Sequence, residues 1–140
     1  MELRSAIQLP NGHFVISQGE NAENDHRVSI VDDNGAVLKS IGGKHGSSNG
    51  EFYSPAYLVV DESGFILVAD QNNRRVVLLS PDLEFRREVI QEREGLRYPV
   101  RMDLDRTSGR LFVAHNDNLE GHELGDWRDG GIKALDFKLH

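Results

Sequence analysis

The sequence predicts an all-β fold, a partial β-propeller of three antiparallel blades, from three observations. Pro55 and Asp61 stand six residues apart, and Pro99 and Asp105 repeat that spacing 44 residues later. Each copy contains short apolar or β-branched segments bounded by Gly, Pro, Asn or Asp, which is the chemistry of strands and turns. Four antiparallel strands in about 40 to 50 residues is the period of a propeller blade.

One domain is expected over residues 1–140, with blades at about 1–45, 46–94 and 95–140. The first blade is expected to have strands at about 5–9, 13–17, 27–31 and 36–41. The second is expected to have strands at about 56–61, 65–69, 75–79 and 84–90. The third is expected to have strands at about 100–105, 110–114 and 132–137. The total is eleven because the last blade lacks its outer strand.

The copies share a register, since Gly12, Gly64 and Gly109 occupy the same turn position. The innermost strands are expected to follow Pro55 and Pro99. The second strands, such as Phe65–Ala69 and Leu111–Ala114, are nearly all apolar and should be covered on both faces by neighbouring blades. The alternative fold is a single antiparallel sandwich or barrel, but the regular spacing favours blades.

The composition and net charge of the chain disfavour several classes of function and partner. Of 140 residues, 38% are apolar, and 16 Lys and Arg against 23 Asp and Glu give a net charge of −7. This balance disfavours a nucleic-acid or anionic membrane partner. The absence of cysteine excludes disulfides, a Cys nucleophile and thiolate zinc sites. With no apolar leader and no apolar run of about 20 residues, a cytoplasmic protein without a membrane partner is expected.

The second copy carries a family resemblance. It contains Gly50-Glu51-Phe52-Tyr53-Ser54-Pro55, Leu58-Val59-Val60-Asp61, Ile66-Leu67-Val68-Ala69-Asp70 and Asn73-Arg74-Arg75-Val76. This closely resembles the NHL repeat, whose pattern is G-x-F-x-x-P, an apolar strand ending in Asp, V-A-D and N-[HR]-R-V. The first copy keeps His26-Arg27-Val28 and Gly42-Gly43 but has Ser17-Gln18 in place of Ala-Asp. The third keeps Pro99, Asp105 and Val113-Ala114 but has His115 in place of the Asp.

The chain is similar to the C-terminal NHL region of tripartite-motif (TRIM) ubiquitin ligases. The resemblance implies a non-enzymatic module without a cofactor, whose rim loops bind protein or RNA. Ligase chemistry would belong to other modules, because these need Cys/His zinc sites. The alternative is a fragment of an NHL-like propeller enzyme, of the amidating lyase or hydrolase type, with a metal in the channel. Here the innermost strands offer Asp61, Asp103 and Asp105 but no His.

The candidate binding residues lie in two loops. One loop contains Asp70, Asn72, Asn73, Arg74 and Arg75. It either contacts a partner or has a structural role, in which Asp70 accepts hydrogen bonds from the backbone or from Arg75.

The other loop is a long insertion, 116–130, which follows His115 and holds Trp127 and Arg128. A Trp beside an Arg fits an interface hot spot, and the alternative is a solvated edge loop. The carboxylates of this loop lack the spacing of a calcium loop.

The remaining candidates are charged or titratable residues. The six histidines, at 13, 26, 45, 115, 122 and 140, lack a metal-ligand spacing and are expected to be scattered on the surface. An arginine cluster from Arg74 to Arg101 is a candidate RNA or phosphopeptide patch. Interleaved glutamates favour ordinary charge mixing instead.

The last expectation concerns how a propeller of only three blades is completed. Closed propellers have about four to eight blades, because closure protects the faces and edges of every blade. Three blades leave two apolar flanks bare. We therefore expect the chain to associate with itself as half of a two-chain ring, or to be the C-terminal half of a six-bladed parent.

Overall fold

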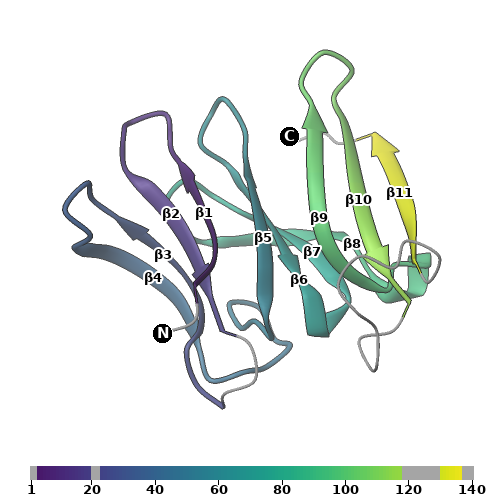
Figure 1. Cartoon of the computed structure of the whole chain (residues 1–140), viewed down its shortest axis with the longest axis horizontal. Coiled ribbons are helices and arrows are strands. Elements are labelled where there is room, and N and C mark those ends of the chain that lie inside the picture. Colours follow the sequence, from purple (N-terminus) through teal and green to yellow (C-terminus); the bar gives the residue numbers. More distant parts are fainter. Residues whose placement is uncertain (1–2, 20–22, 118–129, 137–140) are drawn as a thin grey trace.

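Three antiparallel sheets make up the computed structural model, which describes residues 3–19, 23–117 and 130–136 (Figure 1). Blade 1 contains β1 (Leu3–Gln8), β2 (Phe14–Gln18), β3 (His26–Val31) and β4 (Val37–Gly43). Blade 2 contains β5 (Pro55–Val60), β6 (Ile66–Asp70), β7 (Arg75–Leu79) and β8 (Phe85–Ile90). Blade 3 contains β9 (Tyr98–Asp105), β10 (Arg110–Asn116) and β11 (Gly130–Asp136). The described part of the chain thus confirms the partial propeller with eleven strands.

The blades are arranged around their first strands. β5 contacts both β1 and β9, and in Figure 1 it stands between them while the other strands fan outwards. Within each blade the strands pair in chain order. The prediction that the strands beginning at Pro55 and near Pro99 are innermost is therefore confirmed.

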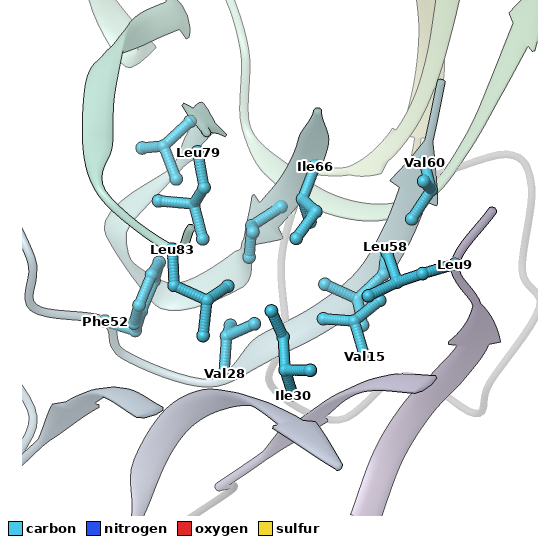
Figure 2. Packing of buried hydrophobic residues seen from close by; sticks show 12 residues of the cluster. Leu9, Val15, Val28, Ile30, Phe52, Leu58, Val60, Ile66, Leu79 and Leu83 are labelled. Atoms are coloured by element: carbon cyan, nitrogen blue, oxygen red, sulfur yellow. The ribbon is translucent and has the colours of Figure 1, made fainter. Parts of the chain in front are cut away.

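Two apolar cores separate the blades, and β6 contributes to both. Ile66 and Val68 pack toward blade 1, in the core that Figure 2 shows, whereas Leu67 and Ala69 pack toward blade 3. Successive side chains of a strand point to opposite faces, so a strand between two cores must be apolar at every position. Ile66 to Ala69 are all buried, which confirms the prediction for this strand except at Phe65, which is half-buried and precedes β6.

The turn between the first two strands of a blade is determined by an Asp and a Gly. Asp61 Oδ1 accepts hydrogen bonds from the backbone N–H groups of Ser63 and Phe65, both at 2.9 Å. Gly64 completes the turn with a φ of +87°, which glycine adopts without a steric penalty. Asp105 accepts the Thr107 N–H in the same way. The Asp of the repeat pattern is thus a turn residue.

One expectation was wrong in detail, and two short elements were missed. In β10, Leu111 and Val113 are fully buried, but Phe112 and Ala114 are half-buried, because no further blade among the described residues covers that face. Two 3₁₀ turns, Gln71–Asn73 and Glu92–Glu94, were not predicted. Among the described residues, no helix has the length and apolar character needed to cross a membrane.

Candidate functional site

The predicted loop after β6 is built on a buried ion pair. Asp70 is fully buried, and its carboxylate accepts hydrogen bonds from Tyr53 N, Asn73 Nδ2 and Arg75 Nε, each at 2.8 Å. Burial raises the pKa of Asp70 above its usual value, and the bonds from Asn73, Tyr53 and Arg75 oppose that shift. The structural interpretation of Asp70 is confirmed: this side chain fixes the loop from inside.

Arg75 extends the same network to the segment before β5. Its guanidinium donates to the carbonyl oxygens of Ser47 at 3.0 Å and Glu51 at 2.8 Å, and to Glu88 Oε1 at 3.0 Å. Only 5% of the Arg75 side chain is exposed. The guanidinium is a fork of five donors, so one side chain can hold several acceptors in fixed positions. Arg75 and Asp70 therefore shape the loops and are not offered to a partner.

Arg74 lies at the surface beside them. Its guanidinium lies 4.6 Å from the centre of the Tyr98 ring, donates to the Tyr98 hydroxyl and pairs with Glu92. These two hydrogen bonds raise the pKa of Arg74 above its usual value. About a third of its side chain is exposed. Arg74, which directly precedes β7 of blade 2, thus contacts the first strand of blade 3 at Tyr98.

The same joint recurs between blades 1 and 2 with different chemistry. His26 occupies the position of Arg74, and Ser54 occupies that of Tyr98. The Ser54 backbone N–H donates to His26 Nδ1 at 3.0 Å, and His26 is fully buried. The expectation that His26 lies on the surface is wrong, because the fold uses its ring as an acceptor between blades.

His115 is the second histidine that is not on the surface. It stands where blade 2 has Asp70, and it is only 7% exposed. Its Nδ1 accepts the Arg97 backbone N–H at 3.1 Å, just as Asp70 accepts that of Tyr53. Burial lowers the pKa of His115 below its usual value, and Lys133 and Arg97 add to this, while Asp117 opposes it. The neutral ring is the form that can accept at Nδ1.

The pKa of His115 is lower in the folded state than its usual value of 6.5. Its contribution to the free energy of unfolding is therefore fully present above pH 6.5. This contribution should be lost as the pH falls from about 6.5 through the folded-state pKa. His115→Asn keeps an acceptor near the Nδ1 position but does not titrate. We expect the wild type to lose more stability than His115→Asn between pH 8 and pH 5. Urea unfolding at both pH values measures this; equal losses would contradict it.

The loop end is our name for the end of the arc where the β6–β7 loop meets the segments before β5 and β9. A hollow of about 310 Å³ lies there. Its lining residues are Ser47, Asn73, Arg74, Arg75, Glu88, Gln91, Glu92 and Arg93. Arg93 is exposed, and no hydrogen bond or ion pair to it occurs within the described ranges. The hollow therefore combines charged side chains that are held in ion pairs, such as Arg74 and Arg75, with one exposed cation, Arg93, that forms none with a described residue.

The structure thus brings Asn73, Arg74 and Arg75 together at one hollow. Asn72 lies nearby and donates to Ser54 Oγ at 3.4 Å. His115 lies in β10 of blade 3 and does not line this hollow. Trp127 and Arg128 lie outside the described residues. Sequence reasoning missed Tyr98 as a site residue. Aligning its position with Ser54 in the preceding copy would have drawn attention to it.

The arginines from Arg74 to Arg101 are spread over several elements. Arg75 is buried, and Arg74 and Arg93 line the hollow at the loop end. Arg87 belongs to the outer strand β8, and Arg101 to the innermost strand β9. An interleaved glutamate, Glu92, pairs with both Arg74 and Arg97.

Metal ligation finds no support among the residues that the structure describes. They contain no group of three or more His, Cys, Asp or Glu side chains placed to hold an ion. A second hollow, of about 420 Å³, lies at the opposite end beside Leu9, Val60 and Asp61. There Arg106 donates to the Val60 carbonyl oxygen at 2.7 Å, so its charge is used within the fold.

Comparisons with known proteins bear on the fold alone. No family of known sequences matches the chain, and no curated protein is detectably similar in sequence. It is similar to the crystal structure of a protein of unknown function from Bacteroides caccae. That match has a TM-score of 0.56 and 18% identity, and covers 96% of this chain but 46% of the other. A DUF4221 family member from Bacteroides vulgatus matches at a TM-score of 0.49 and 15% identity, over 80% and 34% of the two chains. The chain therefore spans less than half the length of either structure.

Proposed function

We propose that this chain is a non-enzymatic binding module of the NHL-repeat kind, which recognises a protein through its loop end. The observation that carries the proposal is the hollow beside Arg74, whose side chain packs on Tyr98 next to the exposed Arg93. In TRIM-type ligases this kind of module selects the substrate, and ubiquitin transfer belongs to other modules.

The chemistry of the hollow favours a protein segment with acidic side chains. Arg and Tyr are enriched at protein interfaces, because they combine large contact area with directed hydrogen bonds. Arg74 is held in place by Tyr98 and Glu92, so little side-chain entropy is lost when a partner binds. Arg93 supplies a cation that no described carboxylate neutralises.

RNA is a less suitable partner for this surface. Glu88 and Glu92 line the same hollow, and the whole chain has a charge of −7. Phosphate recognition depends on several uncompensated Lys or Arg side chains, and carboxylates among them repel the backbone. No observation in the described residues favours the alternative, a fragment of a propeller enzyme.

Capture from cell extract, with the 140-residue chain as bait, tests the proposal through a matched pair of variants. Arg93→Glu reverses the exposed charge at the hollow, and Lys39→Glu reverses an exposed charge on β4. We expect Arg93→Glu to reduce the recovered partner at least about tenfold, since like charges facing each other cost several kcal/mol. Lys39→Glu should recover as much as the wild type.

Two outcomes would contradict the proposal. One is equal recovery with Arg93→Glu and the wild type. The other is RNA crosslinking that is strong at about 50 mM salt and falls steeply by about 200 mM, as phosphate neutralisation requires.

A further inference from the structure

The two outer faces of the arc carry apolar side chains, and no blade among the described residues covers them. We call the far face of blade 1 the leading flank. Along β2 its residues alternate with the core-facing Val15, and on β1 and β3 they pair with those residues. The leading flank consists of Ala6, Phe14, Ile16 and Val37. On the far face of blade 3, which we call the trailing flank, residues alternate with the core-facing Leu111 and Val113. The apolar residues of the trailing flank are Phe112, Ala114, Ile132 and Ala134, and the charged Arg101 and Asp103 of β9 lie on the same face, since they pair with Ala114 and Phe112.

The trailing flank uses the positions with which blade 2 packs on blade 3. Ile132 pairs with Ala114 as Val76 pairs with Ala69, so Ile132 and Val76 are equivalent. Val76 is fully buried between blades, whereas Ile132 is 72% exposed. An apolar residue at an interface position thus faces solvent in this chain.

The leading flank uses the positions with which blade 2 packs on blade 1. Ala6 pairs with Ile16 as Leu58 pairs with Val68. Leu58 and Val68 are almost fully buried against blade 1, whereas Ala6 is exposed. Both flanks therefore continue an interface that the chain already forms twice.

We infer that the two flanks bind each other between two copies of this chain, closing a ring of six blades. Blade 3 of each copy packs on blade 1 of the other, and one two-fold axis relates the two contacts. Both flanks of both copies are then covered, as closure of a propeller requires.

The direction of packing between blades within the chain favours a second copy packed in the same direction. Within the chain, every contact between blades joins a trailing face to a leading face, as β6 does on its two sides. Packing two trailing flanks together would break that pattern.

The solution mass, measured by light scattering on a sizing column, tests the inference. The wild type should have twice the 15.7 kDa mass of one chain. Ile132→Lys and Ala6→Glu each place a charge in both contacts of the ring and should raise the dissociation constant at least about 100-fold. Each variant alone should therefore be a monomer at micromolar concentration.

Mixing the two variants distinguishes this ring from other dimers. In a mixed dimer, one contact joins two unaltered flanks, and the other brings the introduced lysine side chain of one copy near the introduced glutamate side chain of the other. The mixture should thus recover the dimer mass.

Leu38→Lys is the matched control, since Leu38 is also exposed but stands where blade 2 has the solvent-facing Arg86. This variant should remain a dimer. The control separates a ring contact from a general effect of added charge.

Circular dichroism and a cooperative melt confirm that each variant is folded, and Ala134→Lys, exposed on the same trailing flank, replaces Ile132→Lys if that variant unfolds. Three results would overturn the inference. The first is a wild-type mass other than twice that of one chain. The second is an unchanged dimer with Ala6→Glu. The third is a mixture of the two variants that remains monomeric.

Discussion

Asp70→Ala should lower the free energy of unfolding by about 3 to 5 kcal/mol, because it leaves the Arg75 guanidinium buried without its main counter-charge. The Arg75 side chain is 5% exposed, so water cannot replace the lost carboxylate. The Tyr53 N–H, which donates to Asp70 at 2.8 Å, also loses its acceptor. Urea unfolding followed by circular dichroism measures the loss, at one protein concentration because association adds to stability.

Glu88→Gln is the matched control for Asp70→Ala. Glu88 also pairs with Arg75, at 3.0 Å, but 28% of its side chain is exposed, so solvent screens the interaction. Its loss should cost about 1 kcal/mol or less. A loss below about 1 kcal/mol for Asp70→Ala would show that Arg75 is satisfied by the carbonyl groups around it, and that the buried pair does not hold the loop.

The local parts of this fold were predictable from the sequence, because short-range chemistry determines them. The repeat of Pro and Asp placed the innermost strands, and β7 has the predicted bounds, 75–79. The Asp70 and Arg75 pair joins residues five positions apart, so the loop pattern alone indicated it. Turn residues such as Gly64 act within four residues, and their positions were also correct.

Contacts between blades were not predictable in the same way. Arg74 meets Tyr98 across 24 residues, and Ser54 meets His26 across 28. These pairs form only when two sheets pack, and their chemistry differs from one joint to the next. The burial of His115 was missed for a related reason. The sequence places His115 at the position of Asp70, but it does not show that the ring is buried there and accepts the backbone N–H of Arg97, 18 residues away.

Gly42→Ala should be the most damaging glycine substitution in blade 1. Gly42 lies in β4 opposite Arg27 and has a φ of +104°, which L side chains rarely adopt. An added Cβ would lie 2.3 Å from the His26 carbonyl oxygen and 2.9 Å from Arg27 Cα. Both are backbone atoms of the paired strand, so neither can move without breaking the ladder. We expect a loss of about 2 to 4 kcal/mol in the free energy of unfolding.

Gly35→Ala separates the backbone strain from this clash. Gly35 also has a positive φ, +83°, but an added Cβ there meets no atom within 4 Å. Its cost should be about 1 to 2 kcal/mol, the penalty for a left-handed residue. The gain from a stiffer unfolded chain is the same for both substitutions and cancels in the comparison. Equal losses for the two variants in urea unfolding would mean that β4 shifts away from β3 to admit the methyl group. A larger loss for Gly42→Ala would show that close backbone packing is what requires the first glycine of the Gly42-Gly43 pair.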